Sequence, residues 1–194
     1  MILGPKDLLK LVKKIKLVEN LSERELTNPE GAGFDLRLGE VYKISGNAFL
    51  GEIHRKTADI KLIAKYLTNS DGRQTKREIK NGERGKQSVK IKPGDFFLVK
   101  TIESVNMPKD LTASITPRST TYRSGLFIRT GNVPPGYCGG LTFGVSNEGP
   151  IAVEIEMGAR IVHIQFSEVK GGGSMYRGQW QGGRVTARKK EKQV

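Results

Sequence analysis

The side chains best suited to chemistry lie close together in residues 117–126. Arg118 and Arg123 flank the hydroxyls of Ser119 and Thr120 in this segment. Guanidinium groups form paired hydrogen bonds with phosphate oxygens, and hydroxyls can add further donors. Glycines follow at turn-like intervals between apolar runs of strand length, and glycine lets a backbone approach a ligand closely. The segment therefore predicts an anion site presented by short β-strands, unless the two arginines pair with surface carboxylates.

The apolar pattern predicts a mainly β fold with a helix near the N-terminus. Residues 7–18 carry apolar side chains at helical spacing with lysines between them, which predicts an amphipathic helix. A short helical turn is expected over residues 21–26. From Phe34 onward, short apolar stretches are divided by Gly, Pro, Asn and Asp, a spacing typical of an all-β sandwich or barrel. The 194 residues suit one domain with a substantial core, which we place at residues 1–170.

Two basic segments depart from this pattern. Residues 68–88 are polar and basic, and we interpret them as an exposed insertion. They contain no aromatic residues on which bases could stack, so we do not expect a nucleic acid partner. Residues 171–194 open with three glycines that form a flexible hinge. The rest of this segment is a basic tail that we expect to be mobile without a ligand.

Composition narrows the class of partner without choosing one. The net charge of +13 favours anionic partners, nucleotides among them. Cys138 is the single cysteine, so an internal disulfide and the cysteine pair of a zinc deaminase are both excluded. No apolar run approaches the ~20 residues of a membrane span, and the first residues lack the features of a secretory signal. We therefore expect a cytoplasmic protein with no membrane partner.

Motifs spread over most of residues 20–188 resemble the superfamily of dCTP deaminases and trimeric dUTPases. In the family's order, the matching segments are Ala32-Gly33-Phe34-Asp35-Leu36-Arg37-Leu38-Gly39, Lys92-Pro93-Gly94-Asp95-Phe96-Phe97-Leu98, Pro117-Arg118-Ser119 with Arg123 and Gly125, Gly136-Tyr137-x-Gly139, Gly158-x-Arg160-Ile161 and Tyr176-Arg177-Gly178-Gln179. The chain length, residues 92–126 and the tail motif favour the deaminase branch. The resemblance implies a distorted jelly-roll-like β-sandwich or barrel with an N-terminal amphipathic helix, assembled as a homotrimer.

The resemblance also implies where a nucleotide binds. It places a deoxynucleoside triphosphate, with Mg²⁺, between the subunits of the homotrimer. Tyr137 would pack on the deoxyribose, and a core tyrosine is the alternative. Gln179 would reach the phosphates once the tail orders, and an exposed polar side chain is the alternative. The full set of expected contacts comprises a phosphate segment, the tyrosine, a strand whose backbone reads the pyrimidine, and the tail glutamine: Arg118, Ser119, Thr120, Arg123, Tyr137, Thr142, Phe143, Gly144 and Gln179.

Three more polar residues have open roles. Asp35, in the first motif, is expected either in a structural ion pair with Arg160 or in catalysis. His163 stands where many relatives of the family carry glutamine. It could face the phosphates or serve as a hydrogen-bonded structural residue. His54 matches no motif and is expected at the surface.

The resemblance fails at the residues that activate water. In dCTP deaminases a glutamate is the general base, and Gly144 stands at its position. In dUTPases an aspartate in the turn before the tyrosine does this work, and Pro134 stands there. Residues 126–147 contain no Asp or Glu, and Glu148 is the nearest acid downstream. Loss of a general base costs ~10²–10⁴-fold in rate. Because neither of the two water-activating acids is present, the catalytic residues are unknown.

Three groups of functions therefore stay open: the family-level activity, two alternatives within the superfamily, and nucleic acid binding. The family-level activity is the hydrolase reaction that deaminates dCTP to dUTP in pyrimidine deoxynucleotide metabolism. The alternatives within the superfamily are a dUTP diphosphatase and a non-catalytic nucleotide-binding relative. A nucleic acid binder that uses the basic insertion and tail is a third and more distant interpretation.

Overall fold

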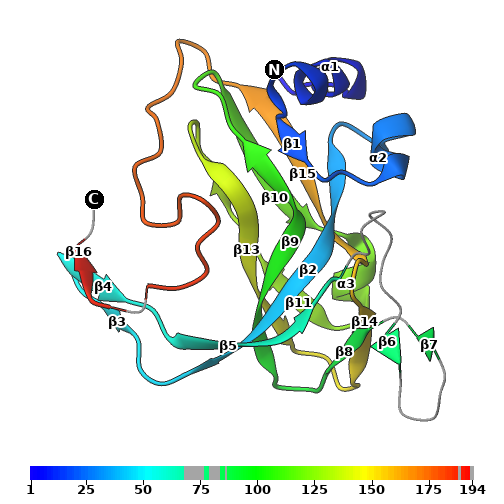
Figure 1. The fold of residues 1–194 in the computed structure, drawn as a ribbon, viewed down its shortest axis with the longest axis vertical. Coiled ribbons are helices and arrows are strands. Elements are labelled where there is room, and N and C mark those ends of the chain that lie inside the picture. The colour runs from blue at the N-terminus through cyan, green and yellow to red at the C-terminus, as the bar shows by residue number, and fades with distance from the viewer. Residues whose placement is uncertain (68–76, 79–83, 86, 188, 193–194) are drawn as a thin grey trace.

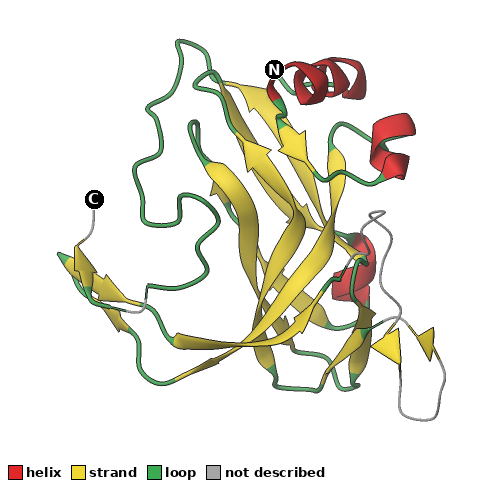
Figure 2. Cartoon of the chain, in the orientation of Figure 1, coloured by secondary structure: helices red, strands yellow, loops and turns green. Residues whose placement is uncertain are grey.

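A computed structural model describes residues 1–67, 77–78, 84–85, 87–187 and 189–192. One large antiparallel sheet curls into a half-barrel, with the N-terminal helices at one end and the C-terminal tail along one side (Figures 1 and 2). The prediction of a mainly β fold is therefore confirmed. Most of the predicted insertion at 68–88 lies outside the described residues, and its role stays a prediction. Among the described residues, no helix is long and apolar enough to cross a membrane.

The predicted amphipathic helix is α1 (Pro5–Ile15), and its Leu8 is fully buried. Proline is well suited to open a helix because the first N–H groups have no intrahelical partner. The helix ends three residues earlier than we expected. Lys16 adopts a left-handed conformation with φ 53°, and its N–H caps a carbonyl of the last turn. Val18 consequently belongs to a strand. The expected short turn is α2 (Glu23–Thr27), which Ser22 caps.

The large sheet has the strand order β11-β13-β9-β2-β15-β10-β12, with β1 added beside β9 and β5 beside β2. Its strands are β1 (Val18–Glu19), β2 (Phe34–Ser45), β5 (Asp59–Lys65), β9 (Phe96–Asn106), β10 (Leu111–Pro117), β11 (Leu126–Arg129), β12 (Asn132–Val133), β13 (Cys138–Asn147) and β15 (Arg160–Glu168). The register shifts within four of the pairings, β13 with β9, β2 with β9, β15 with β2 and β2 with β5. Such bulges increase the twist and help the sheet to curl.

Alternate residues of these strands fill the core. Phe34, Leu36, Ile164 and Phe166 are fully buried, and the rings of Phe34 and Phe166 pack edge to face with centroids 6.4 Å apart. Each large side chain buried in this way contributes about 1.5–3 kcal/mol of transfer free energy. The curled sheet is therefore a stable frame for the loops and strand edges at its rim.

Three small sheets and one short helix complete the fold. β3 (Phe49–Leu50) and β4 (His54–Lys56) form a projecting hairpin, and β16 (Glu191–Lys192) of the tail pairs with β4. β8 (Ser88–Ile91) pairs with β14 (Val153–Glu156), and β6 (Arg77–Glu78) pairs with β7 (Arg84–Gly85). The short helix α3 (Ser119–Arg123) follows β10. The tail therefore returns to the main domain through β16, although the sequence predicted a mobile segment.

Candidate functional site

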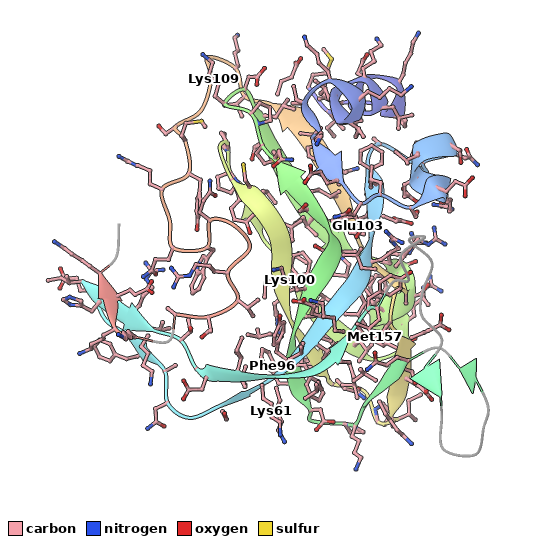
Figure 3. All side chains as sticks on the ribbon, viewed as in Figure 1. Lys61, Phe96, Lys100, Glu103, Lys109 and Met157 are labelled. Carbon is pink, nitrogen blue, oxygen red and sulfur yellow. The ribbon has the colours of Figure 1, made fainter. Side chains whose placement is uncertain are left out.

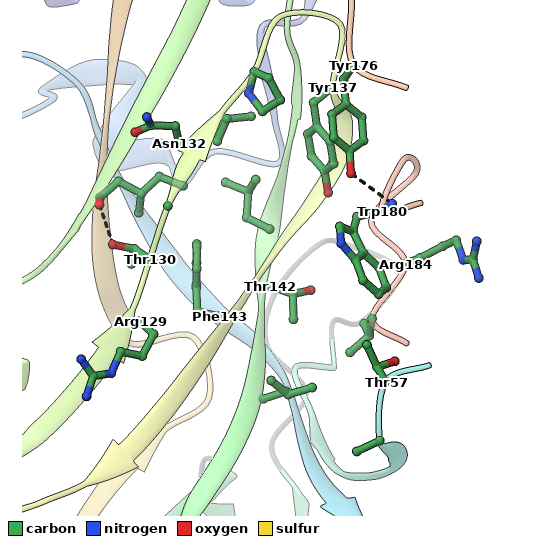
Figure 4. A pocket seen from close by; sticks show the side chains of 18 residues that line it. Thr57, Arg129, Thr130, Asn132, Tyr137, Thr142, Phe143, Tyr176, Trp180 and Arg184 are labelled. Carbon is green, nitrogen blue, oxygen red and sulfur yellow. Dashed lines mark hydrogen bonds between the residues drawn. The ribbon is translucent and has the colours of Figure 1, made fainter. Parts of the chain in front are cut away.

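A pocket of about 510 Å³ lies between β13 and the tail. Its volume is in the range of sites that hold drug-sized ligands. Three of the expected nucleotide-binding residues line it: Tyr137, Thr142 and Phe143. Figure 4 shows the tail residues Tyr176, Trp180 and Arg184 on the opposite side of the pocket from Phe143. The remaining lining residues are Thr57, Ala58, Leu98, Ile115, Arg129, Thr130, Gly131, Asn132, Val133, Pro134, Leu141 and Val185.

Tyr137 is held rigidly at one end of the pocket. Gly136 has a φ of 79° and turns the chain just before it. The Tyr137 hydroxyl donates a hydrogen bond of 2.8 Å to the carbonyl oxygen of Gly140. Its ring meets that of Tyr176 edge to face, with centroids 5.4 Å apart. Burial raises the pKa of Tyr137 to about 12, so the phenol is neutral at physiological pH. The residue is thus both a core tyrosine and a wall of the pocket.

The strand edge beside Tyr137 is free where a base could bind. β11 pairs with β13 only from Gly144 to Asn147. Residues 141–143 therefore have no β11 residue opposite them on this side. Thr142 adds an unused side-chain group, because its buried hydroxyl oxygen has no hydrogen-bond partner in the described structure. Buried polar groups are rarely left without a partner, but this oxygen is itself buried from solvent, so a ligand in the pocket could reach it only after neighbouring atoms move.

The tail is fastened over the pocket by side-chain contacts. The amide of Gln181 accepts a hydrogen bond from the Cys138 N–H at 3.1 Å and donates one to the Gly136 carbonyl at 2.9 Å. Farther along, the Ala187 N–H donates to the Thr57 hydroxyl at 2.8 Å. Gln179 lies outside the pocket lining, and its amide nitrogen donates to Glu191 at 2.8 Å. The part of the tail that lines the pocket forms its tail wall. This wall includes Trp180 and Arg184, which the sequence analysis did not single out.

The expected phosphate segment does not line this pocket. Arg118 precedes α3, and Ser119, Thr120 and Arg123 lie on it, exposed to solvent. Figure 1 places α3 on the opposite side of the curled sheet from the tail. Within one chain, the structure thus brings together the residues expected to contact the sugar and base and keeps the expected phosphate segment apart from them.

Asp35 is the centre of a buried ionic network beside α3. It is only 3% exposed and forms ion pairs with Arg118 and, at 2.9 Å, with Arg160. The expected pair between Asp35 and Arg160 is therefore confirmed. His163 Nδ1 lies 3.0 Å from the Asp35 carboxylate. Burial lowers the pKa of His163, so this ring is neutral at physiological pH. Arg118 is thus paired with a carboxylate inside the chain, although this carboxylate is buried and the alternative to phosphate binding named surface carboxylates.

Sequence reasoning missed two buried acids. Glu25 is fully buried and accepts a hydrogen bond of 3.0 Å from the backbone N–H of Asp35. The spacing of Ser22 and Glu25 matches a helix capping box, so the sequence indicates a local role for Glu25. Its hydrogen bond to Asp35, ten residues away, could not be inferred from that spacing. Glu103 on β9 is also fully buried and accepts from Arg37 Nε at 2.6 Å (Figure 3). Burial raises the pKa of Glu103. Neither acid lines the pocket.

The position expected for a general base is filled from the neighbouring strand. A Cβ atom at Gly144 would lie 2.9 Å from Cζ of Phe96, closer than real side chains approach. Glu148 hydrogen-bonds to Ser146 at 2.9 Å and forms an ion pair with Arg129 at 3.3 Å, and it does not line the pocket. No carboxylate and no imidazole is found among the described lining residues. His54 is exposed, as expected.

The described residues also contain no group of three or more His, Cys, Asp or Glu that could hold a metal ion. A magnesium ion at this site would therefore depend on oxygen ligands from a bound triphosphate and from water, which is a common way for proteins to use Mg²⁺.

Comparison with known proteins places the chain in a family. A model of the dCTP deaminase-like family matches residues 2–169. A dUMP-forming dCTP deaminase of Dictyoglomus turgidum is 32% identical over 171 residues, which cover 86% of this chain and 79% of that protein. A dCTP deaminase of Thermococcus kodakarensis is 31% identical over 182 residues, covering 93% and 95% respectively. The chain belongs to the dCTP deaminase-like family.

The fold agrees with this assignment. The crystal structure of the 2'-deoxycytidine 5'-triphosphate deaminase from Agrobacterium tumefaciens superposes with a TM-score of 0.60 at 19% identity. The match covers 85% of this chain and 46% of that one, so the chain spans about half the length of that structure. The resemblance to the dCTP deaminase and dUTPase superfamily inferred from the motifs is confirmed.

Proposed function

We propose that this protein binds a pyrimidine deoxynucleoside triphosphate in the pocket and deaminates dCTP only slowly. The sugar would lie against Tyr137 and the base along the free edge at residues 141–143. Curated relatives named dCTP deaminases make dCTP the reference substrate. The observation that carries the proposal is the absence of any carboxylate or imidazole from the described pocket lining. Among the described lining residues of one chain, no side chain could take a proton from a water molecule bound there.

We further propose that the complete site forms between subunits of a homotrimer. Arg118, Ser119, Thr120 and Arg123 stay the expected phosphate residues, although they do not line the pocket of their own chain. A neighbouring copy related by cyclic symmetry could bring its α3 to this pocket. Gly144 and Gln179 would then be peripheral residues of the site. Mg²⁺ would be bound through the phosphate oxygens. With one free cysteine, a reducing cytoplasm is the compartment we propose.

A dUTP diphosphatase is the second candidate. Pro134 lines the pocket at the position where the resemblance expects the aspartate of that reaction. A proline ring has no group that could position or activate water, so this candidate lacks its catalytic group just as the deaminase does. We therefore rank it below binding with slow deamination.

The test is incubation of the full-length protein with dCTP, dUTP, dTTP or dATP and Mg²⁺, with product analysis and calorimetry in parallel. We expect measurable binding of pyrimidine nucleotides and little product. Rapid formation of dUTP from dCTP, or of dUMP from dUTP, would show that a group outside the described lining activates water. Absence of binding by all four nucleotides would refute the proposed function.

A further inference from the structure

The end of the tail and the projecting hairpin together form a surface that the nucleotide pocket does not explain. β3, β4 and β16 make a three-stranded antiparallel sheet, which we call the tail sheet, at the left of Figure 1. Lysines and an exposed phenylalanine gather on one of its two faces. We propose that this face binds single-stranded nucleic acid without sequence preference.

The strand register determines which side chains share a face of the tail sheet. Directly paired residues of antiparallel strands point to the same side, and neighbours along a strand alternate. Phe49 pairs with Lys56, and Lys192 pairs with His54, which is two residues from Lys56 on β4. The Lys190 ammonium lies 4.5 Å from the centre of the Phe49 ring. We call this side, none of whose residues lines the nucleotide pocket, the basic face: Phe49, His54, Lys56, Lys190 and Lys192.

The acids of the tail sheet do not neutralise the basic face. Glu191 alternates with Lys192 along β16, so its side chain points to the opposite side. Its carboxylate accepts a hydrogen bond from Gln179 at 2.8 Å and forms an ion pair with Arg184 at 2.6 Å. Glu52 lies in the turn between β3 and β4. Within the described residues, the lysines of the basic face have no carboxylate partner.

Cations beside an exposed aromatic ring suit a single nucleic acid strand. Lysines attract the phosphates, and a base of any sequence can stack on an aromatic side chain. Residues two apart on a strand are separated by about 7 Å, so Lys190 and Lys192 have a spacing comparable to that of neighbouring phosphates in an extended strand. Phe49 is 48% exposed, so a base can reach part of its ring. The net charge of +13 adds long-range attraction for a polyanion.

The aromatic residue comes from a part of the chain distant from the tail. Neither the basic insertion at 68–88 nor residues 181–194 contain an aromatic side chain, and for the insertion this was the reason not to expect a nucleic acid partner. The pairing of β16 with β4 brings the tail lysines beside Phe49. The fold thus supplies the combination of charge and ring that is missing from each segment alone.

An anionic lipid surface would also attract these lysines. Membrane binding additionally requires apolar side chains that enter the lipid together from one side. Leu50 is 82% exposed, but it alternates with Phe49 along β3 and therefore lies on the opposite face. The exposed apolar residues of the hairpin consequently do not form one membrane-facing side, and the arrangement favours nucleic acid.

The experiment is fluorescence anisotropy of labelled oligo(dT), roughly 20 nucleotides long, with the full-length protein at several salt concentrations. We expect binding that weakens as the salt concentration rises. Lys190→Gln with Lys192→Gln should weaken it about tenfold or more at ~0.1 M salt and lower the slope of log K against log salt by about 1.4, or ~0.7 for each phosphate contact. Lys13→Gln with Lys14→Gln is the matched control, since it removes the same charge from α1, far from the tail sheet (Figure 1). This control pair should leave the slope unchanged.

Substitutions of Phe49 test whether the ring contributes by stacking. Phe49→Leu keeps an apolar side chain without a ring and should weaken oligo(dT) binding about fivefold or more, whereas Phe49→Tyr should retain it. A duplex of the same length should bind more weakly, because its bases are not free to stack on the ring. Equal binding of the duplex, or equal affinities of the Leu and Tyr variants, would overturn the proposal.

Three further outcomes would also overturn it. The first is no binding of oligo(dT) at low salt, including the case in which phosphatidylserine vesicles bind instead. The second is an equal effect of the two lysine pairs, which would indicate only a general attraction to a basic protein. The third is displacement of oligo(dT) by saturating dCTP with Mg²⁺, which would place the strand in the nucleotide pocket. Each of these results leaves the function proposed for that pocket standing.

Discussion

At the scale of single residues, Gly144 and Phe96 explain why the pocket lacks a general base. Glycine at this position is not an empty place that any acid could fill, because the Phe96 ring lies within 2.9 Å of where its Cβ would be. Phe96 is 41% exposed, so a side chain at position 144 requires the end of this ring to turn further toward solvent. Phe96 therefore occupies the space that a catalytic side chain would need.

This packing predicts that two substitutions together, rather than one, can introduce a carboxylate. Gly144→Glu alone should give little deamination of dCTP, because the new side chain must displace the Phe96 ring. Gly144→Glu with Phe96→Ala removes the obstruction and should be faster than the single variant. A general base contributes ~10²–10⁴-fold when it is well placed. Product formation from saturating dCTP measures both variants, with Phe96→Ala alone as the control. Equal rates for the single and double variants would show that Phe96 is not the obstacle.

At the scale of elements, the β-strands could be predicted and the contacts between distant segments could not. Short apolar stretches divided by Gly, Pro, Asn and Asp predicted a mainly β fold after Phe34, and helical spacing predicted α1. Helix ends depend on single backbone conformations, such as the left-handed Lys16, which the pattern does not contain. Tyr137, Thr142 and Phe143, which the resemblance assigns to the nucleotide, line one pocket, and their binding role stays a prediction. Trp180 and Arg184 were missed because the tail wall depends on pairing such as Thr57 with Ala187, 130 residues apart.

The packing of β15 against β2 makes stability depend on pH. His163 and Asp35 lie opposite each other in these strands, and burial, together with the charge of Arg118, lowers the pKa of His163 from its ordinary value of 6.5, although nearby Glu25 acts in the opposite direction. Below about pH 6.5 the unfolded chain binds a proton here that the folded chain does not. The contribution of His163 to the free energy of unfolding therefore falls as the pH drops below that value, whereas the raised pKa of Glu103 acts in the opposite direction.

We expect this loss of stability to depend on His163 and not on His54, the second histidine of the chain. Urea unfolding of the wild type at about pH 7.5 and 5.5 should show lower stability at the acidic pH. His163→Gln should reduce that difference, since glutamine does not titrate. The exposed His54→Gln should leave it unchanged. If His163→Gln and the wild type lose the same free energy between the two pH values, His163 does not titrate as proposed.

At the scale of the whole molecule, the separation of the pocket from α3 is the main argument for a trimer. In one chain, Tyr137, Thr142 and Phe143 line the pocket beside the tail, and α3 lies on the other side of the curled sheet from the tail (Figure 1). In a site built from two copies, the pocket of one chain and the α3 segment of the other would contact the same nucleotide. A homotrimer would have a mass of about 64 kDa, three times the 21.4 kDa of the chain, and light scattering can measure it directly.

Mixed trimers test whether each site takes residues from two chains. Arg123→Ala should weaken nucleotide binding about tenfold or more by removing a charge-assisted contact, and Tyr137→Ala should weaken it by removing the sugar wall. After the two variants are unfolded, mixed and refolded together, some sites pair an intact α3 with an intact Tyr137. Those sites should bind with wild-type affinity. A mixture that binds no better than either parent would contradict a site shared between subunits.

The rate of dCTP turnover at saturating substrate tests the central claim most directly. The protein should be mixed with excess dCTP and Mg²⁺, with occupancy verified by calorimetry and the nucleotide then recovered and identified over time. Because the described pocket lining contains no group that can accept a proton from water, we predict that bound dCTP is recovered largely unchanged. The rate should be at least ~10²-fold below the ~1–10³ s⁻¹ of ordinary enzymes. Turnover at ~1 s⁻¹ or faster would contradict the account and require a water-activating group from another part of the assembly.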